Sequence, residues 1–142
     1  MGCHDSAWHY LATMVFTKRI EVRWSDMDAF RHVNNATYLT YLEEARDQWL
    51  VDRIGADATN TFVLARVAVD YRSSVTQDDD VIEVSLELER VGRSSLATRE
   101  RIVVPHDGRL AVEAEAVLVH FDWQTGASLP IDDDLRAALT SG

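Results

Sequence analysis

The chain has 142 residues, of which 46% are hydrophobic and 27% charged, which is typical of one folded domain with a real core. Its formal net charge of −10 at pH 7 argues against a nucleic-acid partner, which usually requires a basic face. No apolar run approaches the ~20 residues that a membrane-spanning helix needs, so we expect no membrane partner. The only cysteine, Cys3, excludes an intramolecular disulfide, and no cysteine–histidine spacing resembles a zinc site. We therefore expect a reducing, cytoplasmic location and no metal.

The first part of the chain predicts an extension followed by a strand. We expect residues 1–13 to lie outside the core of a single domain that spans 14–142. Apolar and polar residues then alternate from Phe16 to Trp24, which predicts a strand with one buried face. A polar loop over 25–35 follows it.

The next stretch predicts one long helix over 36–54. Apolar residues recur there at helical spacing, and neither glycine nor proline interrupts them. The side-chain oxygen of Asn34 or Asn35 suits an N-cap, and Gly55 stands where a C-terminal cap is expected. The apolar residues at helical spacing are Tyr38, Leu39, Tyr41, Leu42, Ala45, Trp49, Leu50 and Ile54.

The remainder is almost entirely strand-like. The order strand, long helix and four strands favours an α+β fold, with the helix packed on one face of an antiparallel sheet. The other face of that sheet carries many acidic residues, and we expect part of it to pack against a partner subunit. The predicted elements are strands at 62–75, 81–91, 95–104 and 110–123 and a short terminal helix at 132–139.

The loop ahead of the long helix holds the most informative side chains. Asp26, Asp28, His32, Asn34 and Asn35 lie close together in sequence, directly before the predicted helix start. The first turn of a helix has N–H groups without intrahelical acceptors, and these can hold an anion or an oxygen that becomes one. A carboxylate beside such N–H groups is the minimum equipment for attack on a carbonyl or thioester.

The motif D-x-D-x-x-x-H-V-N-N-x-x-Y-x-x-Y-x-E-x-A-R over 26–46, together with the order of the elements, resembles the hotdog-fold thioesterases. The most similar group is the 4-hydroxybenzoyl-CoA thioesterase family, which includes small bacterial acyl-CoA thioesterases. The segments Asp70–Arg72 and Gly92–Ser95 agree with this resemblance. It implies a curved antiparallel sheet wrapped around one long helix, with the chain order β-α-β-β-β-β.

The resemblance also implies an activity and an assembly. It implies an acyl thioester hydrolase that cleaves acyl-CoA, or an acyl carrier protein thioester, without a cofactor. It further implies a homodimer or homotetramer with the active site at the dimer interface. Asp28 is the implied base or nucleophile, and the helix N-terminal N–H groups are the implied oxyanion hole.

The other catalytic candidates follow from departures within the family. Some members have a histidine at the place of Asn35, whereas the histidine of this loop is His32. Both residues are therefore candidates for positioning the water or the carbonyl. Another branch of the hotdog thioesterases uses a glutamate on the long helix, and Glu43 is the candidate for that part.

Further candidates would contact the substrate. Backbone N–H groups at the helix start would hold the carbonyl oxygen, and an aromatic ring on the helix would line the pocket. Arginine forks suit the phosphates of coenzyme A, and serine hydroxyls can bond the pantetheine arm. The candidate substrate-binding residues are Asn34, Ala36, Tyr38, Arg72, Arg93, Ser94 and Ser95.

Structural and functional alternatives accompany these predictions. Asp26 fits a structural loop acid, Glu43 fits a partner of Arg46, and the acidic run 78–80 fits a solvated turn. Two other functions are compatible with the same motif. One is an acyl-CoA binding or sensing module without turnover, and the other is an enoyl-CoA hydratase-like enzyme that uses Asp28 and a histidine to move a proton.

Overall fold

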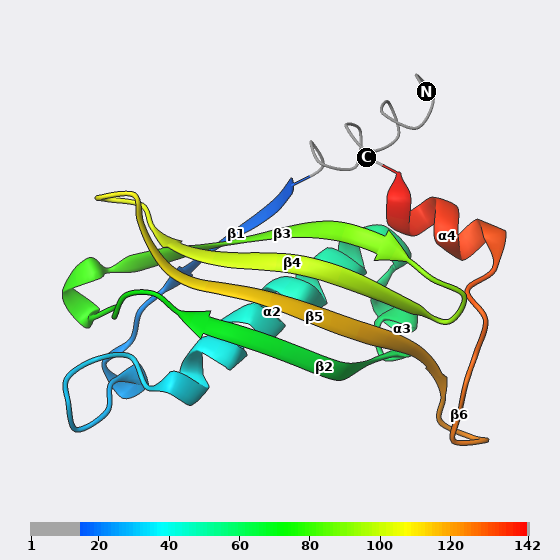
Figure 1. Ribbon diagram of the computed structural model, residues 1–142, viewed down its shortest axis with the longest axis horizontal. Helices are drawn as coiled ribbons and strands as arrows, with labels where there is room; N and C mark the ends of the chain where they lie inside the picture. Colours follow the sequence, from blue (N-terminus) through cyan, green and yellow to red (C-terminus); the bar gives the residue numbers. More distant parts are fainter. Residues whose placement is uncertain (1–14, 142) are drawn as a thin grey trace.

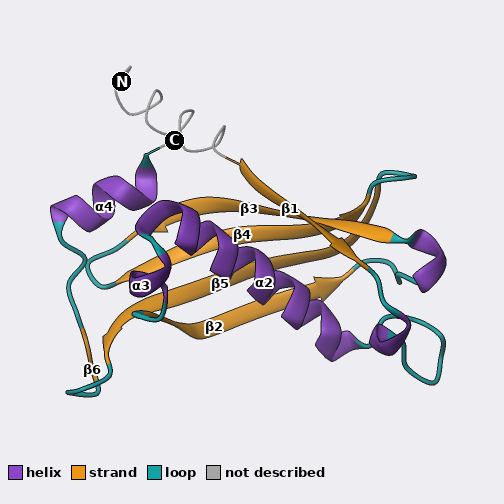
Figure 2. Cartoon of the chain, turned by 180° about the vertical axis from the view of Figure 1, so that it is seen from behind, coloured by secondary structure: helices purple, strands orange, loops and turns teal. Residues whose placement is uncertain are grey.

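The computed structural model describes residues 15–141. Its main sheet is antiparallel with the strand order β1-β3-β4-β5-β2, and the long helix α2 lies across the inner face of this curved sheet (Figures 1 and 2). The strands are β1 (Val15–Glu21), β2 (Phe62–Tyr71), β3 (Val81–Val91), β4 (Ser95–Val104), β5 (Arg109–Asp122) and β6 (Ala127–Ser128), which pairs with β5. The helices are α2 (Asn35–Ile54), α3 (Ala56–Thr59) and α4 (Asp133–Thr140), and the 3-10 helices are η1 (Trp24–Asp26) and η2 (Gln77–Asp79).

This arrangement confirms the predicted α+β fold with one long helix wrapped by an antiparallel sheet. The main elements occur in the predicted chain order, and β3 and β4 have the predicted bounds. Gly55 ends α2 at φ +87°, a conformation that glycine adopts without a steric penalty. The extension predicted for residues 1–13 lies outside the described residues. No helix within residues 15–141 is long and apolar enough to cross a membrane.

The first strand ends earlier than predicted. The backbone N–H of Arg23 donates to Asp26 Oδ2 at 2.9 Å, and this bond helps to turn the chain out of the sheet into η1. Trp24 therefore leaves the strand and is 78% exposed. The prediction that Trp24 lies on the buried face of the strand is wrong, because the alternating pattern continues past the residue at which the chain turns.

The strand predicted over 62–75 also ends early, at Tyr71. The residues that follow form a loop, and Val75 within that loop is fully buried. Its carbonyl oxygen accepts the N–H of Val33 at 2.8 Å, so Val75 fastens one loop to another. The apolar character of this position reflects loop packing against the core and not a place in the sheet.

Helix α2 presents its apolar stripe to the sheet, as predicted, with two exceptions. Leu39 is exposed and Ile54 is only half-buried. The stripe packs against inward-facing strand residues such as Ile82 and Leu86, which are fully buried. The buried predicted positions are Tyr38, Tyr41, Leu42, Ala45, Trp49 and Leu50.

A buried ion pair joins the middle of α2 to β4. Arg46 Nε donates to Glu100 Oε2 at 2.8 Å, and Arg46 Nη2 donates to Glu100 Oε1 at 3.2 Å. The hydroxyl of Thr98 donates to the same carboxylate at 2.7 Å. The predicted pairing of Arg46 with Glu43 is therefore wrong, because Arg46 points into the core while Glu43 is exposed.

Candidate active site

The loop ahead of α2 is a tight hairpin that holds Asp28 through its backbone and its carboxylate. The Asp28 N–H donates to the carbonyl of His32 at 2.9 Å, and the N–H of Arg31 donates to the carbonyl of Asp28 at 3.0 Å. Asp28 Oδ1 accepts the N–H of Phe30 at 2.9 Å. No hydrogen bond within residues 15–141 involves Asp28 Oδ2, so that oxygen is available for chemistry.

The buried side chain of Asp26 holds the segment that leads into this hairpin. It is 2% exposed and accepts hydrogen bonds from the Tyr41 hydroxyl at 2.7 Å and from the Arg23 guanidinium at 3.0 Å. Burial opposes ionisation of Asp26, but the hydrogen bonds from Arg23 and Tyr41 outweigh it and lower its pKa. Burial and the bond to Asp26 raise the pKa of Tyr41. These contacts agree with the predicted structural role of Asp26.

At the start of α2, one backbone N–H group has no hydrogen-bond acceptor among the described residues. The N–H of Asn34 donates to the carbonyl of Asp26, and the N–H of Thr37 donates to the carbonyl of Asn34, both at 2.9 Å. The N–H of Ala36 donates to Asn34 Oδ1 at 2.9 Å, so Asn34 is the N-cap. Among the described residues, none accepts the N–H of Asn35. The predicted oxyanion site therefore narrows to the N–H of Asn35.

Asp28 and Asn35 line the same groove, which has a volume of about 480 Å³. The groove lies between the hairpin, the first turn of α2 and the segment that follows β2. It brings together five of the residues predicted from sequence, namely Asp28, His32, Asn35, Tyr38 and Arg72. The remaining lining residues are Phe30, Val33, Tyr71, Ser73 and Ser74.

On the wall of this groove that follows β2, sequence reasoning predicted Arg72 but missed Ser73 and Ser74. Ser73 and Ser74 fell inside the strand predicted over 62–75, which hid their place in a loop. The Tyr71 hydroxyl donates to the carbonyl of Asn35 at 2.9 Å, so this wall is fastened directly to the first turn of α2. Nothing local in the sequence pairs residues 71 and 35, because the contact depends on how β2 crosses the helix start.

Two residues predicted to contact the substrate already have polar partners within the chain. The Tyr38 hydroxyl accepts the N–H of Val75 at 3.0 Å, and burial raises the pKa of Tyr38. Tyr38 thus supports the groove with its ring, which lies 5.6 Å from the ring of Tyr71. Arg72 Nη2 lies 3.1 Å from Glu113 Oε2, so its guanidinium is already paired with a carboxylate.

Other candidates lie away from the groove within this chain. Glu43 is exposed on α2, about two helical turns beyond Asn35. Arg93 and Ser94 lie in the turn between β3 and β4, and Ser95 begins β4, at the end of the sheet opposite to the hairpin (Figure 1). The single chain therefore does not bring these four residues to Asp28.

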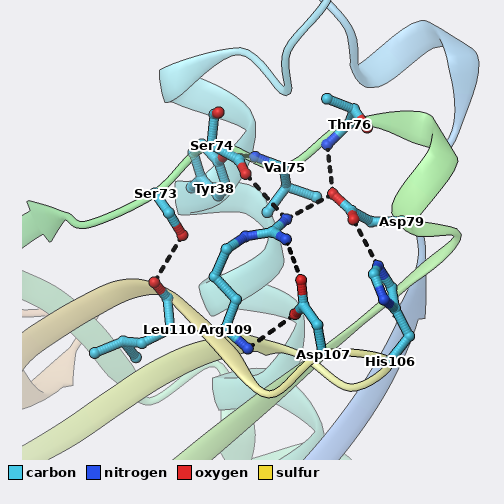
Figure 3. Close-up of polar contacts among 10 residues, drawn as sticks. All are labelled: Tyr38, Ser73, Ser74, Val75, Thr76, Asp79, His106, Asp107, Arg109 and Leu110. Atoms are coloured by element: carbon cyan, nitrogen blue, oxygen red, sulfur yellow. Dashed lines mark hydrogen bonds and ion pairs between the residues drawn. The ribbon is translucent and has the colours of Figure 1, made fainter.

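A polar cluster holds the loop that follows β2 (Figure 3). Arg109 Nη2 donates to the carbonyl of Ser74 at 3.2 Å and to Asp79 Oδ2 at 2.9 Å. Asp79 Oδ1 lies 2.8 Å from His106 Nε2, and Asp79 Oδ2 accepts the N–H of Thr76 at 2.9 Å. Asp79 therefore connects the loop after β2 to the turn between β4 and β5. The interpretation of 78–80 as a simple solvated turn is wrong for this residue.

The cluster makes stability depend on pH. Burial opposes ionisation of Asp79, but bonds from Thr76, His106 and Arg109 outweigh it and lower its pKa. The unfolded chain then binds the proton first as pH falls. The stabilising contribution is complete above the ordinary aspartate pKa of about 3.9 and is lost as pH drops through the lower folded pKa.

We therefore expect Asp79→Asn to destabilise the protein at neutral pH and to flatten the fall of its unfolding free energy below about pH 4. Urea unfolding measured across pH 2.5–7 checks this. Asp78→Asn is the matched control, since Asp78 is the exposed neighbour and makes no hydrogen bond through its side chain among the described residues. Equal pH profiles for the two variants would contradict the assignment.

Comparison with known proteins assigns this fold and groove to a class. The family model described as the thioesterase-like superfamily matches residues 22–139. The long-chain acyl-CoA thioesterase FadM of Escherichia coli strain K12 is 28% identical over 130 residues, which cover 85% of this chain and 94% of FadM. Because the family match spans most of the chain, the chain belongs to the thioesterase-like superfamily.

Solved structures agree with this class. A thioesterase from Thermus thermophilus, in complex with coenzyme A and Zn, has a TM-score of 0.77 and 30% identity, covering 87% of this chain and 95% of that one. A predicted thioesterase from Bacillus stearothermophilus has a TM-score of 0.80 and 29% identity, covering 88% and 93%. The predictions of a hotdog fold and of a thioesterase enzyme are thereby confirmed.

Proposed function

We propose that this enzyme hydrolyses acyl-CoA to a free acid and coenzyme A in the groove at Asp28. One observation carries the proposal: Asp28 and Asn35 line the same groove at a helix N-terminus, and among the described residues neither Asp28 Oδ2 nor the N–H of Asn35 has a hydrogen-bond partner. A thioester carbonyl on that N–H gains negative charge where the helix dipole favours it. The printed names of FadM, an acyl-CoA thioesterase, and of the Thermus complex with coenzyme A support the substrate class.

Asp28 has two routes to the same products. As a base, it takes a proton from water while the water oxygen adds to the carbonyl carbon, and the tetrahedral intermediate then collapses with cleavage of the C–S bond. As a nucleophile, Oδ2 adds to that carbon and expels the thiolate, and water then hydrolyses the resulting anhydride. In both routes the leaving thiolate gains a proton. His32 and the Asn35 side chain would position the water or the carbonyl.

We assign Glu43 no step in this scheme. Its exposed carboxylate lies about two turns along α2 from Asn35, and Glu43 does not line this groove. The position of Asp28 favours the hairpin carboxylate.

We further propose that the active unit is a homodimer, or a tetramer made of two such dimers. In the described part of the chain, β2 pairs only with β5, so its other edge is open. Leu64 and Tyr71 on β2 are 45% and 46% exposed. A two-fold axis at this edge reverses the second copy. That reversal brings the β3–β4 turn of the second copy, with Arg93–Ser95, to the end at which the groove lies. Sedimentation equilibrium checks the assembly.

A thiol-release assay with short, long and aromatic acyl-CoAs tests the proposed function. We expect equal amounts of free thiol and free acid, in excess over the enzyme. Tight acyl-CoA binding without thiol release would instead indicate a binding or sensing module. Loss of enoyl-thioester absorbance without thiol release would indicate a hydratase. Release only from an acyl carrier protein would change the substrate class and retain the reaction.

A further inference from the structure

We propose that Arg31 and Trp24 form a subsite for the phosphate-bearing nucleotide end of coenzyme A. The inference rests on the proposed function and goes beyond it, since it assigns the two ends of the substrate to two grooves. A second groove of about 540 Å³ adjoins the first. It is lined by Trp24, Met27, Arg31, Gln77 and Asp78, with Asp28 common to both grooves.

Because Asp28 lines both grooves, one substrate molecule can extend into both of them. A thioester has two arms that diverge from its trigonal carbonyl carbon, one acyl and one thiol. If the carbonyl lies at Asp28, each arm extends into one of the grooves that meet there. The groove that Asn35 lines contains four largely apolar side chains, Phe30, Val33, Tyr38 and Tyr71. It suits the acyl arm, which leaves the other groove to the thiol arm.

The backbone of Arg31 has a left-handed conformation that residues other than glycine rarely adopt. Arg31 has φ +63°, and among the described residues only Asp80 is another non-glycine residue with positive φ. Its N–H bonds the carbonyl of Asp28, which closes a tight hairpin turn in which glycine fits this left-handed position best. An arginine there strains the backbone, and such strain is typical of residues kept for binding or catalysis.

Of the two arginines that line the grooves, Arg31 is better placed than Arg72 to bind a phosphate, because its charge is not already paired. Arg72 is paired with Glu113 and Asp70, whereas Arg31 is exposed and forms no ion pair within residues 15–141. In a chain of net charge −10, an anionic ligand depends on such an unpaired guanidinium. Asp78 lines the same groove and opposes an anion, so the subsite depends on Arg31 even more strongly.

Trp24 supplies the second element of the subsite. Trp24 is 78% exposed and lines the same groove as Arg31, although a ring of this size is usually covered in a folded protein. A flat, accessible indole next to a guanidinium provides a stacking surface for a purine beside a phosphate contact. The combination fits a nucleoside phosphate, which coenzyme A carries and a plain pantetheine thioester lacks.

The variant Arg31→Gly tests the proposal without damaging the fold, because glycine relieves the strained backbone. Each variant is assayed with an acyl-CoA and with the N-acetylcysteamine thioester of the same acid, which has no phosphate. We expect Arg31→Gly to raise KM for acyl-CoA roughly fivefold, the size of one exposed ion pair, at constant kcat. KM for the truncated thioester should not change, and the melting temperature should not fall.

Three further variants sharpen the result. Arg31→Lys should raise KM for acyl-CoA less than Arg31→Gly does, because lysine retains the positive charge. Asp78→Asn should lower KM for acyl-CoA. Trp24→Ala should raise KM for acyl-CoA only. Arg90→Ala is the matched control, since Arg90 is an exposed arginine without an ion pair among the described residues, on β3 away from both grooves. It should leave both KM values unchanged.

Two results would overturn the subsite. One is an equal change of KM for both substrates, and the other is no change for either in Arg31→Gly. If the wild-type protein turns over no thioester at all, the proposed function fails separately. Calorimetric titration with coenzyme A alone then decides the subsite, since weaker binding to Arg31→Gly than to the wild type supports it and equal binding refutes it.

Discussion

The variant Asn35→Pro is expected to lower kcat on acyl-CoA by about 10²–10³-fold while the protein stays folded. Asn35 is the first residue of α2, and its N–H is the uncommitted group at the helix start. Proline is favoured at the first helical position, where its missing N–H costs no intrahelical bond. Asn34 has φ −59° and ψ +138°, which a residue before proline readily adopts. The substitution thus removes the proposed oxyanion donor and leaves the backbone around it little changed.

Asn35→Ala is the matched control for this experiment. It removes the side-chain amide and retains the backbone N–H, so it isolates the positioning role proposed for the side chain. We expect a smaller loss of kcat than in Asn35→Pro and a similar melting temperature for both variants. Equal activities of the two variants would contradict the view that the N–H of Asn35 holds the thioester oxygen.

The variant Arg46→Met is expected to lower the free energy of unfolding by about 3–5 kcal/mol. The Arg46 side chain is 5% exposed and Glu100 is fully buried, so loss of the arginine leaves a carboxylate in the core without its cation. A buried charge without a partner is costly because neither water nor another ion stabilises it. Urea denaturation with a linear extrapolation measures the effect.

The double variant Arg46→Met/Glu100→Leu separates charge from packing. Replacing both partners with apolar side chains of similar size removes the unpaired charge, and such replacements are often neutral or stabilising. We expect the double variant to recover most of the stability that Arg46→Met loses. A double variant that is less stable than Arg46→Met would show that the ion pair itself, and not relief of a buried charge, stabilises this part of the core.

Local patterns predicted the parts of the fold that depend on neighbours in sequence. The alternation over 81–91 and 95–104 predicted the bounds of β3 and β4, and Gly55 predicted the end of α2. The helix begins at Asn35, one residue before the predicted start, and Asn34 is the N-cap of the two candidates. Trp24 continued an alternating pattern but lies in a turn that the Asp26 carboxylate stabilises. That contact depends on how the loop folds back, which alternation does not encode.

Most of the predicted residues of the candidate site lie on the hairpin and the first turns of α2, and Arg72 is the one predicted residue on the opposite wall. Asp28, His32 and Asn35 belong to one short motif, so the sequence placed them together before the fold was known. The opposite wall, which includes Ser74, is positioned by Arg109, a residue 35 positions away in the chain. Long-range contacts of this kind leave no periodic signal. The same applies to the pairing of Arg46 with a residue on β4.

The rate of thiol release from acyl-CoA by the wild type and by Asp28→Asn tests the central claim most directly. An asparagine keeps an oxygen that can accept the N–H of Phe30, so the hairpin is retained, but it is neither a base nor a nucleophile. We predict hydrolysis by the wild type and a loss of about 10²–10⁴-fold in kcat/KM for the variant at an unchanged melting temperature. An Asp28→Asn protein with full thioesterase activity would contradict the account.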